Sequence, residues 1–233
     1  MKFKANMPAP VEFILQELNR GGHEAYIVGG CVRDGFLGND PHDWDICTSA
    51  TPDKIMEVFP YEKIIPTGLK HGTVTILIND DPYEVTTYRI DGKYTDSRRP
   101  DNVYFTDSLV EDLQRRDFTI NAMAYSPVSG IIDPFNGQKD LLDGLLRCVG
   151  NPDDRFKEDA LRILRAMRFA VKYDLTIEQK TFKAMTMNKE RLSDISKERI
   201  TSELEKMLTS GKNIKGIFTL CSDIISCIFP EQN

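Results

Sequence analysis

The chain has 233 residues, of which 40% are hydrophobic and 28% charged, and its formal net charge is −6 at pH 7. This length is enough for one large domain or two small ones with a real core, and the composition is that of an ordinary globular protein. Because no run of 18 apolar residues occurs and no apolar stretch follows the first lysines, we expect neither a transmembrane helix nor a signal peptide.

The first part of the chain alternates between helical and extended patterns. Apolar residues at helical spacing predict a helix over residues 10–19, and a short buried strand is predicted at 25–28. A threonine before a first-turn proline predicts a short helix over 51–59. Two β-rich runs, 73–78 and 83–88, are joined by Asn-Asp-Asp-Pro and predict a hairpin.

The pattern then becomes polar before it turns helical. Residues 89–105 contain a glycine and a proline and predict a long mobile loop. A capping box at 108–111 opens a helix to about Arg116, and residues 118–125 predict a strand. From Pro152 onward the apolar residues recur at helical spacing.

These patterns predict an α+β chain that divides near residue 145. We expect a head over residues 1–145, with a mixed β-sheet and helices, and an all-helical part over 146–233. The five cysteines have no CxxC spacing and the three histidines are scattered, which argues against a disulfide framework or a zinc site and fits a reducing cytoplasm.

The strongest chemical signal is a Gly-Gly turn, GGCVRD at 29–34, followed nine residues later by Asp43-Trp-Asp45. On a strand, the i, i+2 spacing puts both carboxylates on one face. Two such carboxylates repel each other and are usually held by a cation, and their oxygens suit Mg²⁺. The Gly-Gly turn and Arg33 offer N–H groups and a positive side chain to a phosphate. A solvated loop and a plain turn are the alternative for each element alone.

Three further stretches carry polar groups in patterns that suit a nucleotide. Glu84 lies on a predicted strand and could add a third carboxylate to a two-metal site. Arg115 and Arg116 end a predicted helix, where they could reach a triphosphate or simply favour the helix terminus. The stretch 158–168 repeats Asp or Arg every third residue along one predicted helix, so that it could present donors and acceptors to a base, or form a solvated face of ion pairs.

Charge is also distributed unevenly along the chain. A net charge of −6 argues against a general nucleic-acid binder. Between residues 155 and 172, however, six basic residues stand against only Glu158 and Asp159. The basic charge is therefore focused where a polyanion could bind, on a background that repels nonspecific RNA.

The motifs resemble, in order, the head and neck of class II CCA-adding enzymes and bacterial poly(A) polymerases. The matching stretches are GGCVRD with DWDI, EVTTYR, RRDFTINAMA, IDPFNGQKDLLDG and EDALRILRAMRFA, and ISKERITSELEKML is similar to a later helical motif. The resemblance spans about residues 25–210 and implies a nucleotidyltransferase-fold head followed by a helical neck.

The resemblance also implies a role for individual residues. Asp43 and Asp45 match the Mg²⁺ ligands, and Glu84 matches the third catalytic carboxylate. The family positions that hold the triphosphate and sugar are matched by Gly30, Arg33 and Arg116. The pair that reads the incoming base is matched by Asp159 and Arg162, with Arg165 and Arg168 as supporting phosphate contacts.

The implied activity is Mg²⁺-dependent, template-independent addition of C and A to the tRNA 3′ end from CTP and ATP, in the cytoplasm and without a membrane. The stretch 67–75 and the loop 89–105 resemble those of enzymes that add the full CCA. Polyadenylation of RNA and A-only addition stay open. A nucleotide-binding fragment with weak tRNA turnover is the third alternative, because the family usually continues into helical body and tail domains, which we expect to be absent. The sequence does not define the oligomeric state.

Overall fold

The computed structural model describes residues 3, 5–92, 102–210 and 214–229. Its described residues divide into two compact units. The first unit comprises residues up to 92 together with 102–116 and 120–138, and the second comprises 117–119 and residues from 139 onward. Each unit has its own core and is described by itself.

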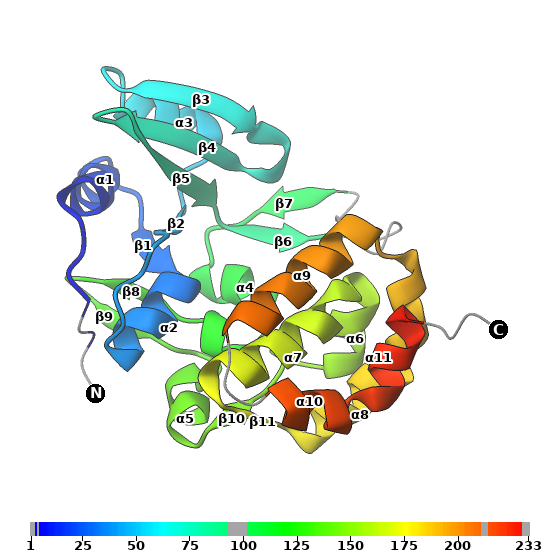
Figure 1. The fold of residues 1–233 in the computed structure, drawn as a ribbon. Coiled ribbons are helices and arrows are strands. Elements are labelled where there is room, and N and C mark those ends of the chain that lie inside the picture. Colours follow the sequence, from blue (N-terminus) through cyan, green and yellow to red (C-terminus); the bar gives the residue numbers. More distant parts are fainter. Residues whose placement is uncertain (1–2, 4, 93–101, 211–213, 230–233) are drawn as a thin grey trace. The chain divides into compact units, whose positions relative to one another are not determined.

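A seven-stranded mixed sheet forms the centre of the first unit (Figure 1). Its strand order is β3-β4-β5-β2-β1-β8-β9, in which β2 and β5 are parallel and all other neighbours are antiparallel. The strands are β1 (Ala25–Val28), β2 (Ile46–Thr48), β3 (Lys63–Gly68), β4 (Thr73–Ile78), β5 (Asp81–Thr87), β8 (Ala124–Ser126) and β9 (Gly130–Ile132). A separate two-stranded ribbon consists of β6 (Arg89–Asp91) and β7 (Val103–Phe105).

The hairpin between β4 and β5 owes its tight turn to two residues with positive φ. Asn79 has φ 53° and Asp80 has φ 69°, a left-handed conformation that Asn and Asp tolerate better than most residues. The two strands then pair from Ile78 with Asp81 to Thr73 with Thr86. This turn therefore fixes the register of β5, the strand that carries Glu84.

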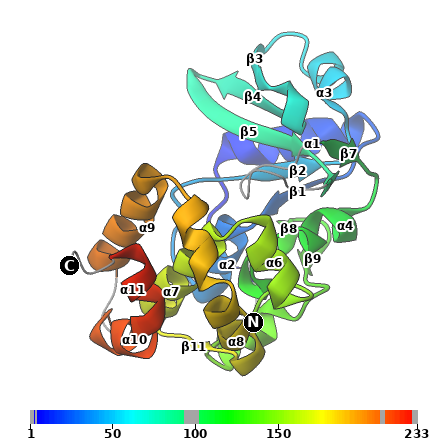
Figure 2. The ribbon, with the colours of Figure 1, turned by 90° about the vertical axis from the view of Figure 1, so that its right-hand side faces the viewer.

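Alternation along these strands separates a buried face from an open one. Val74, Ile76 and Val85 share one face and are fully buried. On that side of the strands lie α1 (Ala9–Arg20) and α3 (Pro52–Val58), which Figure 2 shows on the same side of β3, β4 and β5. Helix α1 buries Val11, Ile14, Leu15 and Leu18. The carboxylates belong to the opposite face.

The other helices of the first unit are short. They are α2 (Gly30–Leu37), α4 (Leu109–Gln114) and α5 (Gly137–Leu142, which crosses into the second unit), with 3₁₀ turns η1 (Leu69–His71) and η2 (Thr119–Asn121, whose first residue belongs to the second unit). Asp133 accepts hydrogen bonds from the N–H groups of Gly137 and Gln138. The motif IDPFNGQKDL thus caps the start of α5, a structural role.

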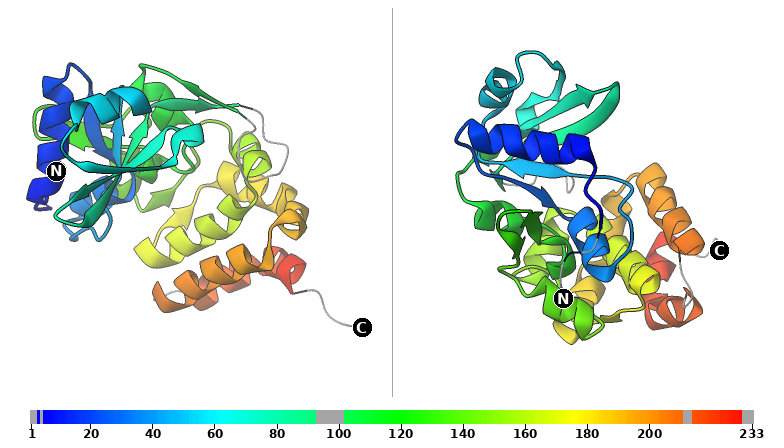
Figure 3. Two further views of the ribbon diagram at one scale, coloured as in Figure 1. Left: turned by 90° about the horizontal axis from the view of Figure 1, so that it is seen from above. Right: turned by 90° about the vertical axis from the view of Figure 1, so that its left-hand side faces the viewer.

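The second unit is mainly helical. Its elements are α6 (Pro152–Glu158), α7 (Leu161–Tyr173), α8 (Gln179–Met187), η3 (Lys189–Asp194), α9 (Lys197–Ser210), α10 (Ile214–Leu220) and α11 (Ser222–Ile228), with a short parallel pair, β10 (Leu145–Leu146) and β11 (Thr176–Ile177). Helices α7 and α9 lie side by side in Figure 3. Phe156, Leu164, Met167, Met185 and Met207 fill the core between the helices.

Most of the predicted elements are confirmed, and the exceptions are local. The α+β class, the first helix, the strand at 25–28 and the hairpin all form. The predicted strand at 118–125 is wrong as one element, because η2 occupies its middle and only its ends pair, Phe118 in a single bridge to Cys148 and Ala124 and Tyr125 in β8. The ends of the predicted loop 89–105 are β6 and β7, while 93–101 lie outside the described residues. The all-helical part contains the β10–β11 pair, and the division at residue 145 remains a prediction.

The alternation of β5 can be tested with two isosteric exchanges. Val85→Thr would bury a hydroxyl group without a partner on the fully buried face, so we expect the free energy of unfolding to fall by about 1–3 kcal/mol. Thr86→Val on the open face removes only a 3.0 Å hydrogen bond to Thr73, and should cost about 1 kcal/mol or less. Urea unfolding measures both, and equal losses would contradict the assignment of faces.

Candidate functional site

Three carboxylates lie near the beginning of β2, where β5 runs alongside it. Asp43 and Asp45 directly precede β2, and Glu84 lies within β5. The parallel register puts Ile46 beside Val85, so one residue earlier Asp45 lies beside Glu84. Neighbouring strands are about 4.8 Å apart. The prediction that both aspartates lie on a strand is wrong, because β2 begins only at Ile46, although the Asp45 carbonyl accepts a 3.0 Å hydrogen bond from the Val28 N–H.

A pocket of about 730 Å³ opens over these carboxylates. Its lining belongs entirely to the first unit. It consists of Pro8, His42, Asp43, Trp44, Asp45, Thr75, Asp81, Pro82, Tyr83 and Glu84. The three carboxylates singled out from the sequence therefore line one cavity, together with the only tryptophan of the chain.

The surroundings of Asp45 disfavour the charged form of its carboxyl group. Desolvation by the surrounding protein raises the pKa of Asp45; the nearby Arg116 guanidinium opposes this effect, and Asp43 adds to it. Across the described ranges, no three or more His, Cys, Asp or Glu side chains stand close enough together to hold a metal ion. The site therefore offers a pair of repelling oxygen ligands with a third nearby, rather than a closed cage.

The turn after β1 brings the backbone close to Asp45. Gly29 has φ +81°, a conformation that glycine adopts without steric cost. A Cβ atom there would lie 3.0 Å from Arg116 Nη1 and 3.9 Å from Asp45 Oδ2. Gly30 then begins α2, and a Cβ on Gly30 would meet Arg33 Nη2 at 3.5 Å. Glycines at both positions thus leave room between the backbone and two arginines.

Arg33 is buried and already engaged within the first unit. It donates from Nη1 to the Asn121 side-chain oxygen and from Nε to Asp34 Oδ1 at 3.0 Å. Only 5% of the residue is exposed. The sequence predicted a phosphate contact for Arg33, and the structure places it beside the Gly-Gly turn with its guanidinium held in position by these partners.

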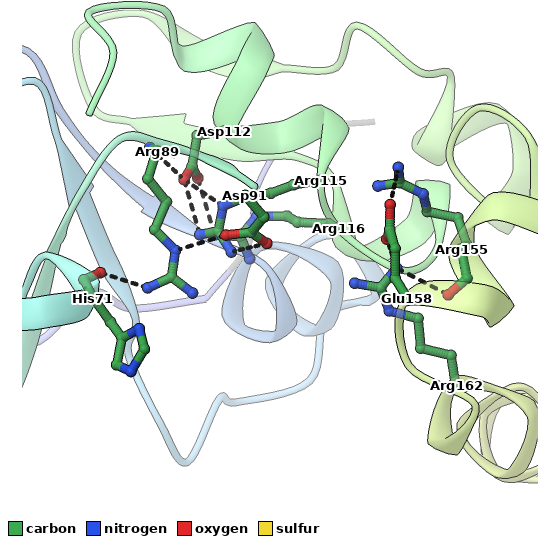
Figure 4. Close-up of polar contacts among 9 residues, drawn as sticks. All are labelled: His71, Arg89, Asp91, Asp112, Arg115, Arg116, Arg155, Glu158 and Arg162. Carbon is green, nitrogen blue, oxygen red and sulfur yellow. Dashed lines mark hydrogen bonds and ion pairs between the residues drawn. The ribbon is translucent and has the colours of Figure 1, made fainter. Parts of the chain in front are cut away.

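Arg116 belongs to a second polar cluster, centred on Asp112 (Figure 4). The Asp112 carboxylate is buried and accepts from Arg115 at 2.9 Å and from Arg116 at 3.4 Å. Desolvation acts to raise the pKa of Asp112, but the two arginines outweigh it and the pKa is lowered. Asp112 therefore stays ionised and fixes both arginines at the end of α4.

The same cluster reaches the first residues of the β6–β7 ribbon. Arg89 donates to the backbone carbonyl of His71 and forms an ion pair of 3.2 Å with Asp91. Asp91 also lies 3.7 Å from Arg115. Figure 4 shows these side chains turned toward one another around Asp112. The β6–β7 ribbon is thus tied to the residues that directly follow α4.

In the second unit, Asp159 lies in a break between two helices. It ends α6 with extended φ and ψ of −146° and 104°, and its carboxylate accepts the Leu161 N–H at 3.0 Å. Its other oxygen pairs with Arg199 of α9 at 2.9 Å. The prediction that one helix carries the whole stretch 158–168 is wrong at this point, because Asp159 caps α7 rather than continuing α6.

The arginines that follow all have acidic partners within the second unit. Arg162 pairs with Glu158 at 2.7 Å, and Glu158 also pairs with Arg155 (Figure 4). Arg165 pairs with Asp117 at 2.6 Å, and Arg168 pairs with Glu203 at 2.7 Å. The ion pairs that the sequence left as an alternative are therefore present, although most of their partners lie on other elements.

Sequence reasoning missed three residues that hold the predicted ones. Asp112, Arg199 and Glu203 were not singled out, yet they fix Arg116, Asp159 and Arg168 respectively. A signal existed only for Asp112, which stands three and four residues before two arginines on one helix. The partners on α9 come from 35 and 40 residues further along the chain, and no local pattern connects them.

Two family models match the chain. The poly A polymerase head domain matches residues 25–147, and the probable RNA- and SrmB-binding site of polymerase A matches residues 174–233. A CCA-adding enzyme from Oceanobacillus iheyensis is 52% identical over 204 residues, covering 88% of this chain and 50% of its own length. One from Limosilactobacillus reuteri is 48% identical, covering 93% and 54%.

The chain belongs to the class II CCA-adding enzyme family. Solved members of the family share its fold. The CCA-adding enzyme of Bacillus stearothermophilus in complex with CTP aligns with a TM-score of 0.82 and 41% identity, over 93% of this chain and 53% of that one. The Thermotoga maritima enzyme complexed with tRNA aligns with a TM-score of 0.79 and 27% identity, over 96% and 52%. The predicted nucleotidyltransferase fold is thereby confirmed.

The chain spans about half the length of the relatives that it matches. Within the described residues, no helix has the length and apolar character needed to cross a membrane. The roles of the individual site residues are predictions.

The close approach at Gly29 predicts a measurable cost for any side chain there. Gly29→Ala would strain a positive-φ backbone and push against Arg116, whose side chain is only 20% exposed and bound to Asp112. Gly22→Ala is the matched control, because Gly22 has φ +83° but nothing within 4 Å of its Cβ position. We expect Gly22→Ala to cost about 1–2 kcal/mol of unfolding free energy and Gly29→Ala at least about 1 kcal/mol more. Equal melting curves would contradict the packing of Arg116 against this turn.

Proposed function

We propose that this chain carries the catalytic part of a tRNA nucleotidyltransferase. Its reaction is the Mg²⁺-dependent, template-independent addition of C and A nucleotides from CTP and ATP to the tRNA 3′ end, with release of pyrophosphate. The observation that carries the proposal is the register of β2 and β5, which puts Asp45 beside Glu84 at the rim of one pocket next to the Gly29 turn. The names of the relatives, and complexes with CTP, ATP and tRNA among solved members, support the substrates.

The carboxylates suit a hard divalent cation. Asp43 and Asp45 would hold it, since they are exposed oxygen donors whose mutual repulsion contributes to the raised pKa of Asp45. Mg²⁺ usually takes one or two protein carboxylates together with substrate phosphates, so it does not require a closed cage of protein ligands. When bound, the cation supplies a Lewis acid that polarises phosphate oxygens and lowers the pKa of a hydroxyl group.

The turn at Gly29 and Gly30 would hold the triphosphate. Arg116 and Arg33 are fixed beside it by Asp112 and Asn121, so little side-chain freedom is lost when an anion binds. The Nε atom of Arg116 is buried and has no hydrogen-bond partner among the described residues. An oxygen from the ligand would satisfy this donor. Desolvation acts to lower the pKa of Arg116, but the nearby Asp112 and Asp45 carboxylates outweigh it and the pKa is raised, so the charge of Arg116 is retained.

The chemistry is a single displacement. The 3′ oxygen of the RNA forms a bond to the α-phosphorus of the nucleotide, and the bond from this phosphorus to the bridging oxygen breaks. Pyrophosphate leaves with the electron pair, and the hydroxyl proton passes to a carboxylate oxygen of the pocket. The arginines stabilise the negative charge on the leaving group, while Glu84 helps to orient the attacking hydroxyl.

Selection of the base is assigned to Asp159 and Arg162 of the second unit. A carboxylate accepts and a guanidinium donates two parallel hydrogen bonds, which is the pattern needed to recognise the edge of cytosine or adenine. Arg199 and Glu158 hold these two side chains at 2.9 Å and 2.7 Å. Arg165 and Arg168 remain supporting contacts in this proposal, held by Asp117 and Glu203.

Three other activities give different products in one assay. The chain is incubated with a tRNA that lacks CCA or with one that already ends in CC, and with labelled CTP, ATP or both. Polyadenylation would give long A tails, A-only addition would need an acceptor that already ends in CC, and a nucleotide-binding fragment would bind CTP without extending the RNA. Stepwise addition of two C residues and one A is the result that we expect.

Removal of a metal ligand should stop transfer without unfolding the protein. We expect Asp43→Asn and Asp45→Asn each to lower the rate of C addition at least about 100-fold, on the scale of several kcal/mol that a catalytic metal supplies. Because the pKa of Asp45 is raised, its charged form costs stability at pH 7, so Asp45→Asn should melt at the same or a higher temperature.

Asp81→Asn is the control, since Asp81 lines the same pocket at the far end of β5. Fluorescence of Trp44, which lies between the two aspartates, reports Mg²⁺ binding directly. Near-normal transfer by either aspartate variant, with an unchanged Mg²⁺ requirement, would refute the metal assignment.

A second prediction tests the base readers. Asp159→Ala and Arg162→Ala should reduce discrimination between CTP or ATP and UTP or GTP by about 1–3 kcal/mol, because an unsatisfied polar partner no longer penalises the wrong base. Binding of the triphosphate should change much less. Lys172→Ala, another basic residue of α7, is the control. Incorporation of all four nucleotides is measured, and an unchanged preference in both variants would remove these residues from the selection step.

A further inference from the structure

We infer that Phe3 is a positioning residue for the nucleotide, because its ring packs against both α2 and β8 and so keeps the Gly29–Gly30 turn in the shape that receives the triphosphate. This inference rests on the proposed function, which assigns the triphosphate to that turn. Phe3 is not among the residues that line the carboxylate pocket. It acts through two elements of the first unit, α2 and β8.

The contact with α2 explains a glycine that the helix itself does not require. Gly35 is buried inside α2 and its φ is not positive, so any residue could adopt its backbone conformation. Glycine in a helix interior is destabilising relative to alanine. A Cβ atom on Gly35, however, would lie 2.7 Å from Cζ and 2.9 Å from Cδ2 of Phe3. The Phe3 ring therefore occupies the space that a side chain at position 35 would fill.

The same ring also contacts β8. Phe3 stacks on Tyr125, with 4.1 Å between the ring centroids and 18° between the ring planes. Stacked aromatic pairs are more favourable than their buried area alone accounts for. Phe3 thus packs against a residue of a helix and a residue of a strand at the same time, and it resists a displacement of α2 relative to β8.

Both of these elements hold the turn, which connects β1 with α2. On one side, the Arg33 N–H donates to the Gly29 carbonyl at 3.2 Å, the first hydrogen bond of the helix. On the other side, the Gly29 N–H donates to the carbonyl of Met123 at 3.1 Å, directly before β8 begins. Tyr125 pairs with Ile27 of β1 in the same ladder. A displacement of α2 relative to β8 would therefore change the geometry of the turn.

The turn gains from being rigid before the ligand arrives. It offers backbone N–H groups to a triphosphate, and an anion binds most tightly when such groups already converge. Gly29 and Gly30 have no side chains that restrict their backbone, so the rigidity of the turn depends on the elements around it. A ring fixed between α2 and β8 lowers the conformational entropy that is lost on binding. Phe3 therefore contributes to the affinity for the nucleotide and has no part in the chemical step.

Steady-state kinetics of Phe3→Ala, with labelled CTP and a tRNA that lacks CCA, test the inference in the full chain. We expect the KM for CTP to rise about three- to tenfold, on the scale of one hydrogen bond to the triphosphate. The kcat and the KM for the tRNA should stay unchanged, because Phe3 lies outside the carboxylate pocket.

Phe13→Ala is the matched control, because it also removes an aromatic pair from the first unit. Phe13 of α1 contacts Phe59, which directly follows α3, with 6.2 Å between the ring centroids. This variant should leave both KM values unchanged. An unchanged CTP KM in Phe3→Ala, or an equal rise in Phe13→Ala, would overturn the inference.

The glycine provides a second test of the same contact. In the wild-type background, Gly35→Ala displaces the Phe3 ring and should raise the CTP KM by the same factor as Phe3→Ala. In the Phe3→Ala background the space is empty, so Gly35→Ala should not raise the CTP KM further and should raise the melting temperature through its higher helix propensity. Additive effects of the two substitutions on the KM would refute a role through this contact.

Hydrogen exchange without any ligand separates the inference from the proposed function. Phe3→Ala should speed exchange at the amides of Gly29 and Arg33, because local opening exposes their hydrogen atoms to water, whereas Phe13→Ala should not. Wild-type activity together with unchanged exchange at the turn in Phe3→Ala would refute the inference alone. Failure of the proposed function has a different signature, since wild-type protein would then neither extend the tRNA nor bind CTP in calorimetry.

Discussion

The site depends on one pairing, that of β2 with β5, the single parallel pair of the seven-stranded sheet described here. Parallel neighbours cannot be joined by a tight turn and need a crossover of a dozen or more residues. In this chain the crossover contains α3, β3 and β4, and the β4–β5 turn then sets the register. A slip of one residue would turn Glu84 to the buried face and Val85 to the carboxylates. The hydrophobic core under Val74, Ile76 and Val85 therefore holds the chemistry in place.

Charge compensation is the second constraint. Asp43 and Asp45 oppose each other, and Arg116 is the cation of the protein that relieves Asp45. Arg116 is itself a buried charge, which is tolerated because Asp112 pairs with it. Asp112 pairs with Arg115 as well, and through Asp91 this cluster extends to the β6–β7 ribbon. The Ser108 side chain, which begins α4 by accepting the Glu111 N–H at 3.4 Å, thus contributes to the site, because it stabilises the helix that both arginines directly follow.

The sequence predicted the candidate site residues better than it predicted the residues that pair with them. Periodicity located β1, the β4–β5 hairpin and α1, since in these elements the local pattern and the tertiary burial agree. It failed for residues 119–123, which the fold buries without extending them. It failed again at Asp159, where a continuous helical pattern conceals a break. The pairs Asp159–Arg199 and Arg168–Glu203 join distant segments, and only folding brings them together.

The ion pairs of the second unit affect how selection of a base can work. The proposed reading groups are occupied before any ligand arrives, Asp159 by Arg199 and Arg162 by Glu158. The binding free energy of a base is therefore only the difference between the hydrogen bonds that it forms and the ion pairs that it replaces. A matching base restores every bond that it breaks, whereas a mismatched base leaves a partly buried carboxylate or guanidinium without a partner, which costs about 1–3 kcal/mol. In the proposed function, occupied reading groups would thus reduce affinity for all nucleotides by a similar amount and would leave the penalty for a wrong nucleotide in force.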